Sequence, residues 1–326
     1  MQRRELIRAA AAAVLLTERG LAHAGPADFP LKPIRLVVPN APGGAADLTA
    51  RALAQKLAAD LGQSVVVDNK PGAGGVVAGE LVARAPADGH TLLLVSSGTA
   101  VSAALFRTLP FDTLRDFAPV SMLASFDLAL VAAPGRFARV ADLLGWAAAH
   151  PGELNIGTPN IGTTQHLAAE LLLTSAGIQA QVVPFNGTPP VLTALRGGEI
   201  HAAVDILGPL MPQVAAGTVQ PLAVLGPKRA AQWPQVPALR ESGGRLAGFD
   251  VSSWNGLAAP AGTPASVVER LSRATRAAMS MPDVKARLLE QNLSAQGSTP
   301  QALASLLDRD IRRWAGLIAQ ANIPRL

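Results

Sequence analysis

The feature that most constrains the fold is a strand–turn–helix unit near the start of the chain, Ile34–Leu57. Its β-rich run, Ile34–Val38, leads into a turn, Pro39–Gly44, with two prolines and two adjacent glycines. Apolar residues at helical spacing then predict a helix that begins near Asp47. Glycines let a ligand approach bare backbone, and the first N–H groups of a helix lie at the positive end of its dipole. The unit therefore predicts a site for a small carboxylate beyond the strand.

Strand and helix patterns alternate along most of the chain, which predicts α/β architecture with largely parallel sheets. The predicted strands are Ile34–Val38, Ser64–Asp68, Thr91–Val95, Val120–Leu123, Leu128–Val131, Leu154–Gly157, Gln181–Pro184, Ile200–Val204, Leu222–Leu225 and Phe249–Ala258. The predicted helices after the first two units are Ala141–His150, Gln165–Ala176, Pro190–Arg196, Ala265–Ser280, Asp283–Gln291 and Pro300–Ala321. Ala124–Asp127 is expected to join two separate strands, and Ser96–Thr99 to form a loop.

The length of 326 residues suits two domains. Each half has its own strands, and a helical block ends the chain, which predicts an interrupted first domain. We expect domain 1 to comprise residues 25–125 and 250–326, and domain 2 to comprise residues 126–249. Ligands of open α/β sheets bind beyond the carboxyl ends of the strands, so we expect a cleft between the domains.

Small and polar residues gather at the predicted strand ends. The candidate ligand-binding residues are Asn40, Pro42, Gly43, Gly44, Asp47, Ser97, Thr99, Asn160, Gly162, Thr163, Thr164, Phe185, Gly187 and Asp205.

Several of these candidates have a second interpretation. Asp47 suits a helix N-cap better than a contact with a ligand amine. Of two adjacent hydroxyl residues, Thr163 is assigned to the ligand and Thr164 to the helix cap. Asp205 follows an apolar strand, so it is either buried and paired or selects an amine or hydroxyl group. Trp254 is assigned to the hinge rather than to the cleft.

Residues 1–24 have the pattern of an export signal. Arginines at the start precede an apolar stretch, Ala9–Leu16, and Ala22–Ala24 is a small-x-small cleavage site. Arg3 and Arg4 resemble a twin-arginine motif, although Glu5 and Leu6 depart from it, so the Tat and Sec routes both stay open. The other interpretation of this segment is an N-terminal helix. The pattern predicts a periplasmic protein, and no apolar run is long enough to span a bilayer.

Composition excludes several classes of function. The net charge is +5, and the first 24 residues contribute +2 of it, too small a surplus for nucleic-acid binding. Cysteine is absent and the five histidines are scattered, so we expect no thiolate chemistry and no metal.

The loops also offer few groups suited to catalysis. The run Gly72–Gly75 is not a dinucleotide motif, because Val77 occupies the position of its third glycine. The chain contains no phosphate-binding GxxxxGK[ST] motif and no GxSxG elbow. We therefore expect binding without catalysis and without a cofactor. The alternative is an α/β enzyme that acts on a small anionic or nucleotide substrate.

Five motifs together resemble the Bug family of periplasmic receptors, the TctC-like components of tripartite tricarboxylate transporters. They are Val38–Gly44 with Asp47, Val67–Gly75, Pro86–Gly89, Asp116–Val120, and Ser253–Leu257 followed by Ala259–Pro264. The resemblance covers nearly all of the chain after the leader. It implies a type II periplasmic-binding-protein fold, with two α/β domains joined by crossover strands and a ligand cleft between them.

The resemblance also implies a function. Such receptors capture a small organic acid (a di- or tricarboxylate, an amino acid or an aromatic acid) for uptake or sensing. Backbone groups and ordered water between Pro42–Gly44 and Asn160–Thr164 would hold one carboxylate. A membrane permease of the same transporter is a candidate partner, although some receptors of this kind stand apart from one. We expect a monomer.

The chain departs from the family pattern at four positions, which predicts an unusual specificity. Asn40 replaces an aromatic residue, and Asn160 lies in a loop that is usually richer in glycine. Gln165 replaces a small hydroxyl residue, and Phe185 replaces a tyrosine.

Overall fold

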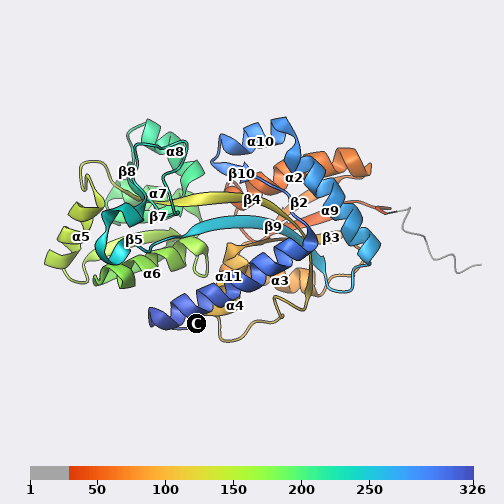
Figure 1. Cartoon of the computed structure of the whole chain (residues 1–326), viewed down its shortest axis with the longest axis horizontal. Coiled ribbons are helices and arrows are strands. Elements are labelled where there is room, and N and C mark those ends of the chain that lie inside the picture. The colour runs from red at the N-terminus through yellow and green to blue at the C-terminus, as the bar shows by residue number, and fades with distance from the viewer. Residues whose placement is uncertain (1–28) are drawn as a thin grey trace, which may run out of the picture.

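Two long strands, β4 (Phe117–Ala132) and β9 (Ser252–Pro260), connect the two halves of the molecule (Figure 1). A computed structural model describes residues 29–326, and the predicted leader, residues 1–24, lies outside them. The two strands are antiparallel to each other from Phe117 to Asp127 of β4. From Leu128 onward, β4 pairs instead with strands of the second lobe. These crossover strands therefore join two α/β lobes, as predicted.

The first lobe holds a parallel group of strands at one edge of the sheet. These strands are β1 (Ile34–Val38), β2 (Val65–Asn69) and β3 (Thr91–Ser96). β1 lies between β2 and β3, and β3 pairs antiparallel with β9. A short strand, β10 (Leu293–Ala295), pairs antiparallel with β4.

The second lobe holds the other group. Its strands are β5 (Leu154–Pro159), β6 (Ala180–Phe185), β7 (Ala202–Ile206) and β8 (Gln220–Val224). β5 is parallel to β6 and β7, whereas β7 and β8 both pair antiparallel with β4.

Helices cover both lobes. Those of the first lobe are α2 (Ala45–Leu61), α3 (Val76–Ala83), α4 (Ser97–Leu105), α9 (Ala265–Ser280), α10 (Pro282–Leu289) and α11 (Pro300–Gln320). Those of the second lobe are α5 (Val140–Ala149), α6 (Thr164–Ala176), α7 (Thr188–Gly197) and α8 (Leu207–Ala215). Short 3₁₀ turns occur at Ala73–Gly75, Leu239–Ser242 and Gly244–Leu246. None of the helices within residues 29–326 is long and apolar enough to cross a membrane.

Two predictions of the strand pattern were wrong. Residues 124–127 do not separate two strands, because β4 is continuous and uses them to pair with β9 and β10. The sheet is mixed rather than largely parallel, since the two crossover strands run against their neighbours. The domain boundaries near Ser125 and Asp250 stay a prediction.

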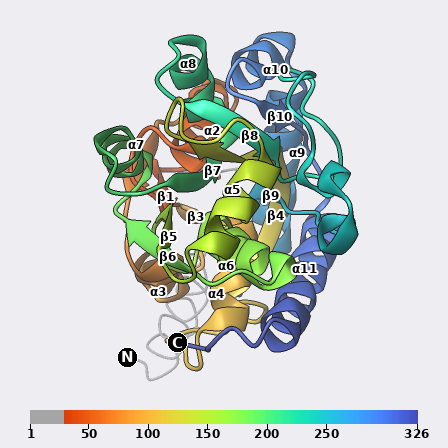
Figure 2. The same cartoon turned by 90° about the vertical axis from the view of Figure 1, so that its left-hand side faces the viewer.

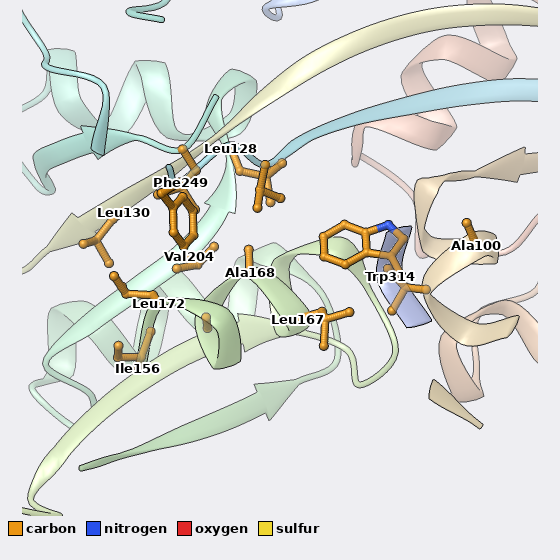
Figure 3. Packing of buried hydrophobic residues seen from close by; sticks show 14 of the residues in the cluster. Ala100, Leu128, Leu130, Ile156, Leu167, Ala168, Leu172, Val204, Phe249 and Trp314 are labelled. Atoms are coloured by element: carbon orange, nitrogen blue, oxygen red, sulfur yellow. The ribbon is translucent and has the colours of Figure 1, made fainter. Parts of the chain in front are cut away.

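The hydrophobic core continues across the junction of the lobes. Figure 3 shows the fully buried Trp314 of α11 between Ala100 of α4 and Leu167 of α6. The chain ends beside α4 (Figure 2), where the Leu326 N–H donates to the Leu105 carbonyl at 3.0 Å. The C-terminal helix therefore packs against both lobes next to the crossover strands.

Candidate functional site

A cavity of about 390 Å³ lies between the lobes and is lined by loops from both of them. Its volume falls in the range of small-molecule sites. The predicted site residues that line it are Asn40, Pro42, Gly43, Gly44, Asn160, Thr163, Thr164 and Gly187. Gly162 lines a small pocket next to it. The structure does not bring Asp47, Ser97, Thr99, Phe185 or Asp205 to the cavity wall.

The opening turn places the first turn of α2 at the cavity. α2 begins at Ala45, two residues before the predicted start, with Gly44 as its N-cap. The N–H groups of Ala45 and Ala46 have no partner within the helix, and both residues line the cavity. Gly43 has φ +87°, a conformation that favours glycine.

Asp47 holds this turn in place. One carboxylate oxygen accepts the Gly43 N–H at 3.0 Å, and Arg51 pairs with the same carboxylate at 2.9 Å. Burial opposes ionisation of Asp47, but the hydrogen bonds from Arg51 and Gly43 outweigh it and lower its pKa. Asp47 therefore caps the turn rather than the N–H groups of the helix, and the Gly43 N–H is used within the protein.

The predicted loop after β3 is the start of a helix, α4, which corrects the sequence-based expectation. Ser96 is its N-cap, and the Ser96 N–H donates to the Thr99 hydroxyl at 3.0 Å. Ser97 is buried, and its hydroxyl lies 2.7 Å from that of Thr164. Ser96 and Gly98 line the cavity in place of the predicted Ser97 and Thr99.

The loop after β5 forms the facing wall. Asn160 has φ +51°, and asparagine tolerates this left-handed conformation better than most residues, so the turn is preserved. Thr163 is the N-cap of α6 and its hydroxyl accepts the His166 N–H at 3.2 Å, whereas Thr164 is the first helical residue. We predicted Thr164 as the helix cap, but the cap is Thr163. Both residues line the cavity.

Phe185 and Gly187 flank the turn that leads into α7. The Phe185 carbonyl accepts the N–H groups of Asn160, at 2.6 Å, and of Gly187, at 3.0 Å. The Phe185 ring packs against the core of the second lobe instead of the cavity. Gly187 is the N-cap of α7, and a Cβ on it would lie 3.8 Å from Ala41 of the first lobe.

Asp205 lies behind the cavity wall and is completely buried. One oxygen accepts the Ile206 N–H at 2.7 Å and the Gln165 amide at 3.5 Å, and Thr188 is a further donor. Burial raises the pKa of Asp205 to about 6, although these hydrogen bonds oppose the shift. The other carboxylate oxygen has no partner in the described part of the chain.

Several lining residues were missed by the sequence analysis. Ser253 and Asn255 belong to β9, and the buried Asn255 amide donates to Thr49 at 3.1 Å and to the Ala45 carbonyl at 3.3 Å. The polar residues Ser252, Ser253 and Asn255 in one strand were the signal that could have revealed them. Gln165, Thr188 and Arg196 also line the cavity.

The loops that line this cavity share one feature, because each of several helices begins at the cavity wall. Residues at the N-termini of α2, α4, α6, α7 and α8 all line the cavity, from both lobes. Each N-terminus contributes partial positive charge. Unpaired N–H groups are fewer, because prolines occupy the first turns of α7 and α8 and the Thr163 hydroxyl accepts one N–H of α6. None of the described residues that line the cavity carries a carboxylate, an imidazole or an ammonium group. Within residues 29–326, no cluster of His, Asp and Glu could hold a metal ion.

The comparisons with known proteins agree on one family. A family model for the tripartite tricarboxylate transporter family receptor (TctC) matches residues 49–323. A UPF0065 protein from the tcbD–tcbE intergenic region of Pseudomonas sp. strain P51 is 38% identical over 296 residues, which cover 90% of this chain and 88% of that protein. Protein BugT of Bordetella pertussis is 32% identical over 313 residues, 95% of each chain. The solved structure of R. palustris Rpa4515 with adipate has a TM-score of 0.87 and 33% identity, and covers 92% of this chain and all of that chain.

Proposed function

This chain belongs to the tripartite tricarboxylate transporter receptor family, and from this premise we propose that it captures a small carboxylate in the cavity between its lobes. Family membership confirms the predicted resemblance and the type II periplasmic-binding-protein fold. The bound acid would be a dicarboxylate, a tricarboxylate, an amino acid or an aromatic acid, held for uptake or sensing.

The observation that carries this proposal is the convergence of five helix N-termini on one cavity. A carboxylate at that point would accept the free N–H groups of Ala45 and Ala46 while the dipoles of the helices offset its charge. The described residues of the cavity wall include no carboxylate, imidazole or ammonium group, the side chains that general acid–base catalysis uses most often, which supports a receptor rather than an enzyme. The adipate bound to Rpa4515, a relative of similar fold, agrees with a carboxylate ligand.

The proposal extends to the cell compartment. The export pattern of residues 1–24, together with the family, supports a periplasmic receptor released from its leader. A permease of the same transporter class is the partner that the family suggests.

A thermal-shift screen tests the proposed function. The mature chain would be heated with dicarboxylates, amino acids, aromatic acids and nucleotides, and a ligand of the native state raises the melting temperature by mass action. We expect at least one acid to stabilise the protein, with the stabilisation growing as its concentration rises. If no acid does so while a nucleotide does, the receptor proposal is wrong and the enzyme alternative gains support.

A further inference from the structure

Helix α7 forms one side wall of the cavity, and the two ends of this wall differ in chemistry. Thr188, Leu192 and Arg196 are spaced by four residues, so they lie along one face of the helix, and all three line the cavity. Thr188 and Arg196 are separated by about 12 Å along the helix axis, at about 1.5 Å per residue. The start of α7 therefore lies among the helix N-termini, whereas Arg196 lies toward the opposite end.

Arg196 is the only residue lining the cavity, within the described chain, that carries a charged side chain. It forms no salt bridge with any residue in 29–326. Its Nη1 donates to the Gln213 side-chain oxygen at 3.3 Å, and that oxygen also accepts the Thr218 hydroxyl at 3.0 Å. A guanidinium has five N–H donors, so Arg196 keeps donors available for an anion.

Part of the cavity lining is apolar. It includes Leu192, Phe126, Ile206 and Pro209. An acyl chain or an aromatic ring fits such a lining because it needs no hydrogen-bond partners. A ligand with one carboxylate among the helix N-termini would place its apolar body here and its far end near Arg196.

Resting on the proposed function, we propose that Arg196 determines specificity by pairing with a second anionic group at the far end of the ligand. Gln213, which also lines the cavity, accepts a hydrogen bond from this guanidinium and holds it at the cavity wall. The receptor therefore prefers a linear α,ω-dicarboxylate to an acid of the same length with a neutral end. A planar guanidinium also suits a bidentate contact with carboxylate, which lysine does not provide.

The test compares each diacid with its own monomethyl ester by calorimetric titration of the mature chain, using succinate, adipate and suberate. The ester retains the length and one carboxylate, so the ratio of the two dissociation constants isolates the far-end charge. For the best-fitting diacid we expect the wild type to favour the diacid about 10- to 100-fold, the range for a charged hydrogen bond. In Arg196→Gln this ratio should fall close to one, while the affinity for the ester stays within about twofold.

Two further variants separate charge from geometry. Arg196→Lys keeps the positive charge but loses the planar guanidinium that can bind a carboxylate through two hydrogen bonds. Its ratio of ester to diacid dissociation constants should therefore lie between those of the wild type and Arg196→Gln. Arg273→Gln removes an exposed arginine from α9, where no described residue forms a salt bridge with it, and should leave the ratio unchanged.

Each outcome has a distinct meaning. If the wild type binds acids but Arg196→Gln keeps the ratio, or weakens diacid and ester equally, the assignment of Arg196 is wrong and the proposed function stands. If the wild type binds neither the diacids nor the esters nor any acid of the thermal-shift screen, the proposed function is wrong and this inference with it.

Discussion

The hydroxyl oxygens of Ser97 and Thr164 lie 2.7 Å apart, although the two residues begin helices in different lobes. Ser253 of the crossover strand β9 lies within hydrogen-bond distance of both hydroxyls. All three residues are buried, so their hydroxyls need hydrogen-bond partners, and they lie close enough to serve one another. The group therefore ties the first lobe, the second lobe and the crossover together beside the cavity.

Replacing Ser97 should weaken this connection without touching the ligand directly, because Ser97 does not line the cavity. We expect Ser97→Ala to lower the free energy of unfolding by about 1–3 kcal/mol, the cost of leaving buried hydroxyl partners unsatisfied. Urea unfolding measures this value. Ser280→Ala, at an exposed serine, is the control and should change the value by less than about 0.5 kcal/mol. Equal stability of the two variants would contradict the structural role of the hydroxyl group.

Gly44 allows ligand binding to be separated from folding. A Cβ at this position would have only the Ala41 carbonyl oxygen nearby, at 3.9 Å, and φ is −87°, so a side chain causes no backbone strain. Because Gly44 lines the cavity, Gly44→Val should reduce acid affinity more than about tenfold, the loss of about one charged hydrogen bond.

Calorimetric titration measures that affinity, and circular dichroism checks the fold. Gly145→Val is the matched control, since no atom lies within 4 Å of a Cβ added there on α5. Unchanged affinity in Gly44→Val would rule out the assigned turn as the carboxylate site.

The sequence allowed the opening turn and the facing loop to be predicted because their conformation is encoded locally. Gly43 and Asn160 both adopt positive φ, and these residue types tolerate it. Their loops follow apolar strands, and ligands of open α/β sheets bind beyond the carboxyl ends of such strands. Both loops line the cavity.

The residues that were misjudged depend on tertiary placement. Ser97 and Thr99 have loop-forming side chains, yet they lie in a helix whose N-cap is Ser96. In the sequence, Asn255 is one of several polar residues in its strand, and only pairing across the sheet brings it to the start of α2. In the sequence, Arg196 is only a basic residue in the last turn of a helix. Its place at the cavity depends on how the fold positions α7.

Asp205 predicts a specific dependence of stability on pH. Its pKa rises from 3.8 to about 6 on folding, so the folded state binds more protons than the unfolded state between these values. The free energy of unfolding should therefore fall as pH rises through this interval, by at most about 3 kcal/mol, at about 1.4 kcal/mol per pKa unit.

Asp205→Asn removes the titrating group and keeps an oxygen acceptor. The variant should gain stability relative to the wild type as pH rises from about 4 to 8, measured as the difference between two urea unfolding series. Taking the difference cancels the other titrating groups and any constant cost of the new amide. A difference that stays flat across this range would show that Asp205 is already ionised at low pH.

Trp254 is hydrogen-bonded to a titrating carboxylate, that of Asp310. Its indole N–H donates to an Asp310 carboxylate oxygen at 2.6 Å, which links β9 to α11 beside the crossover. Burial raises the pKa of Asp310, and the Trp254 hydrogen bond opposes that shift. Trp254→Phe should raise this pKa further. The variant should lose about 2–3 kcal/mol of unfolding free energy at pH 8 and less at pH 4, because protonation of Asp310 removes the charge that the indole N–H stabilises. Adding Asp310→Asn should abolish the difference between the two pH values in urea unfolding, whereas an equal loss at both would reduce Trp254 to a packing role.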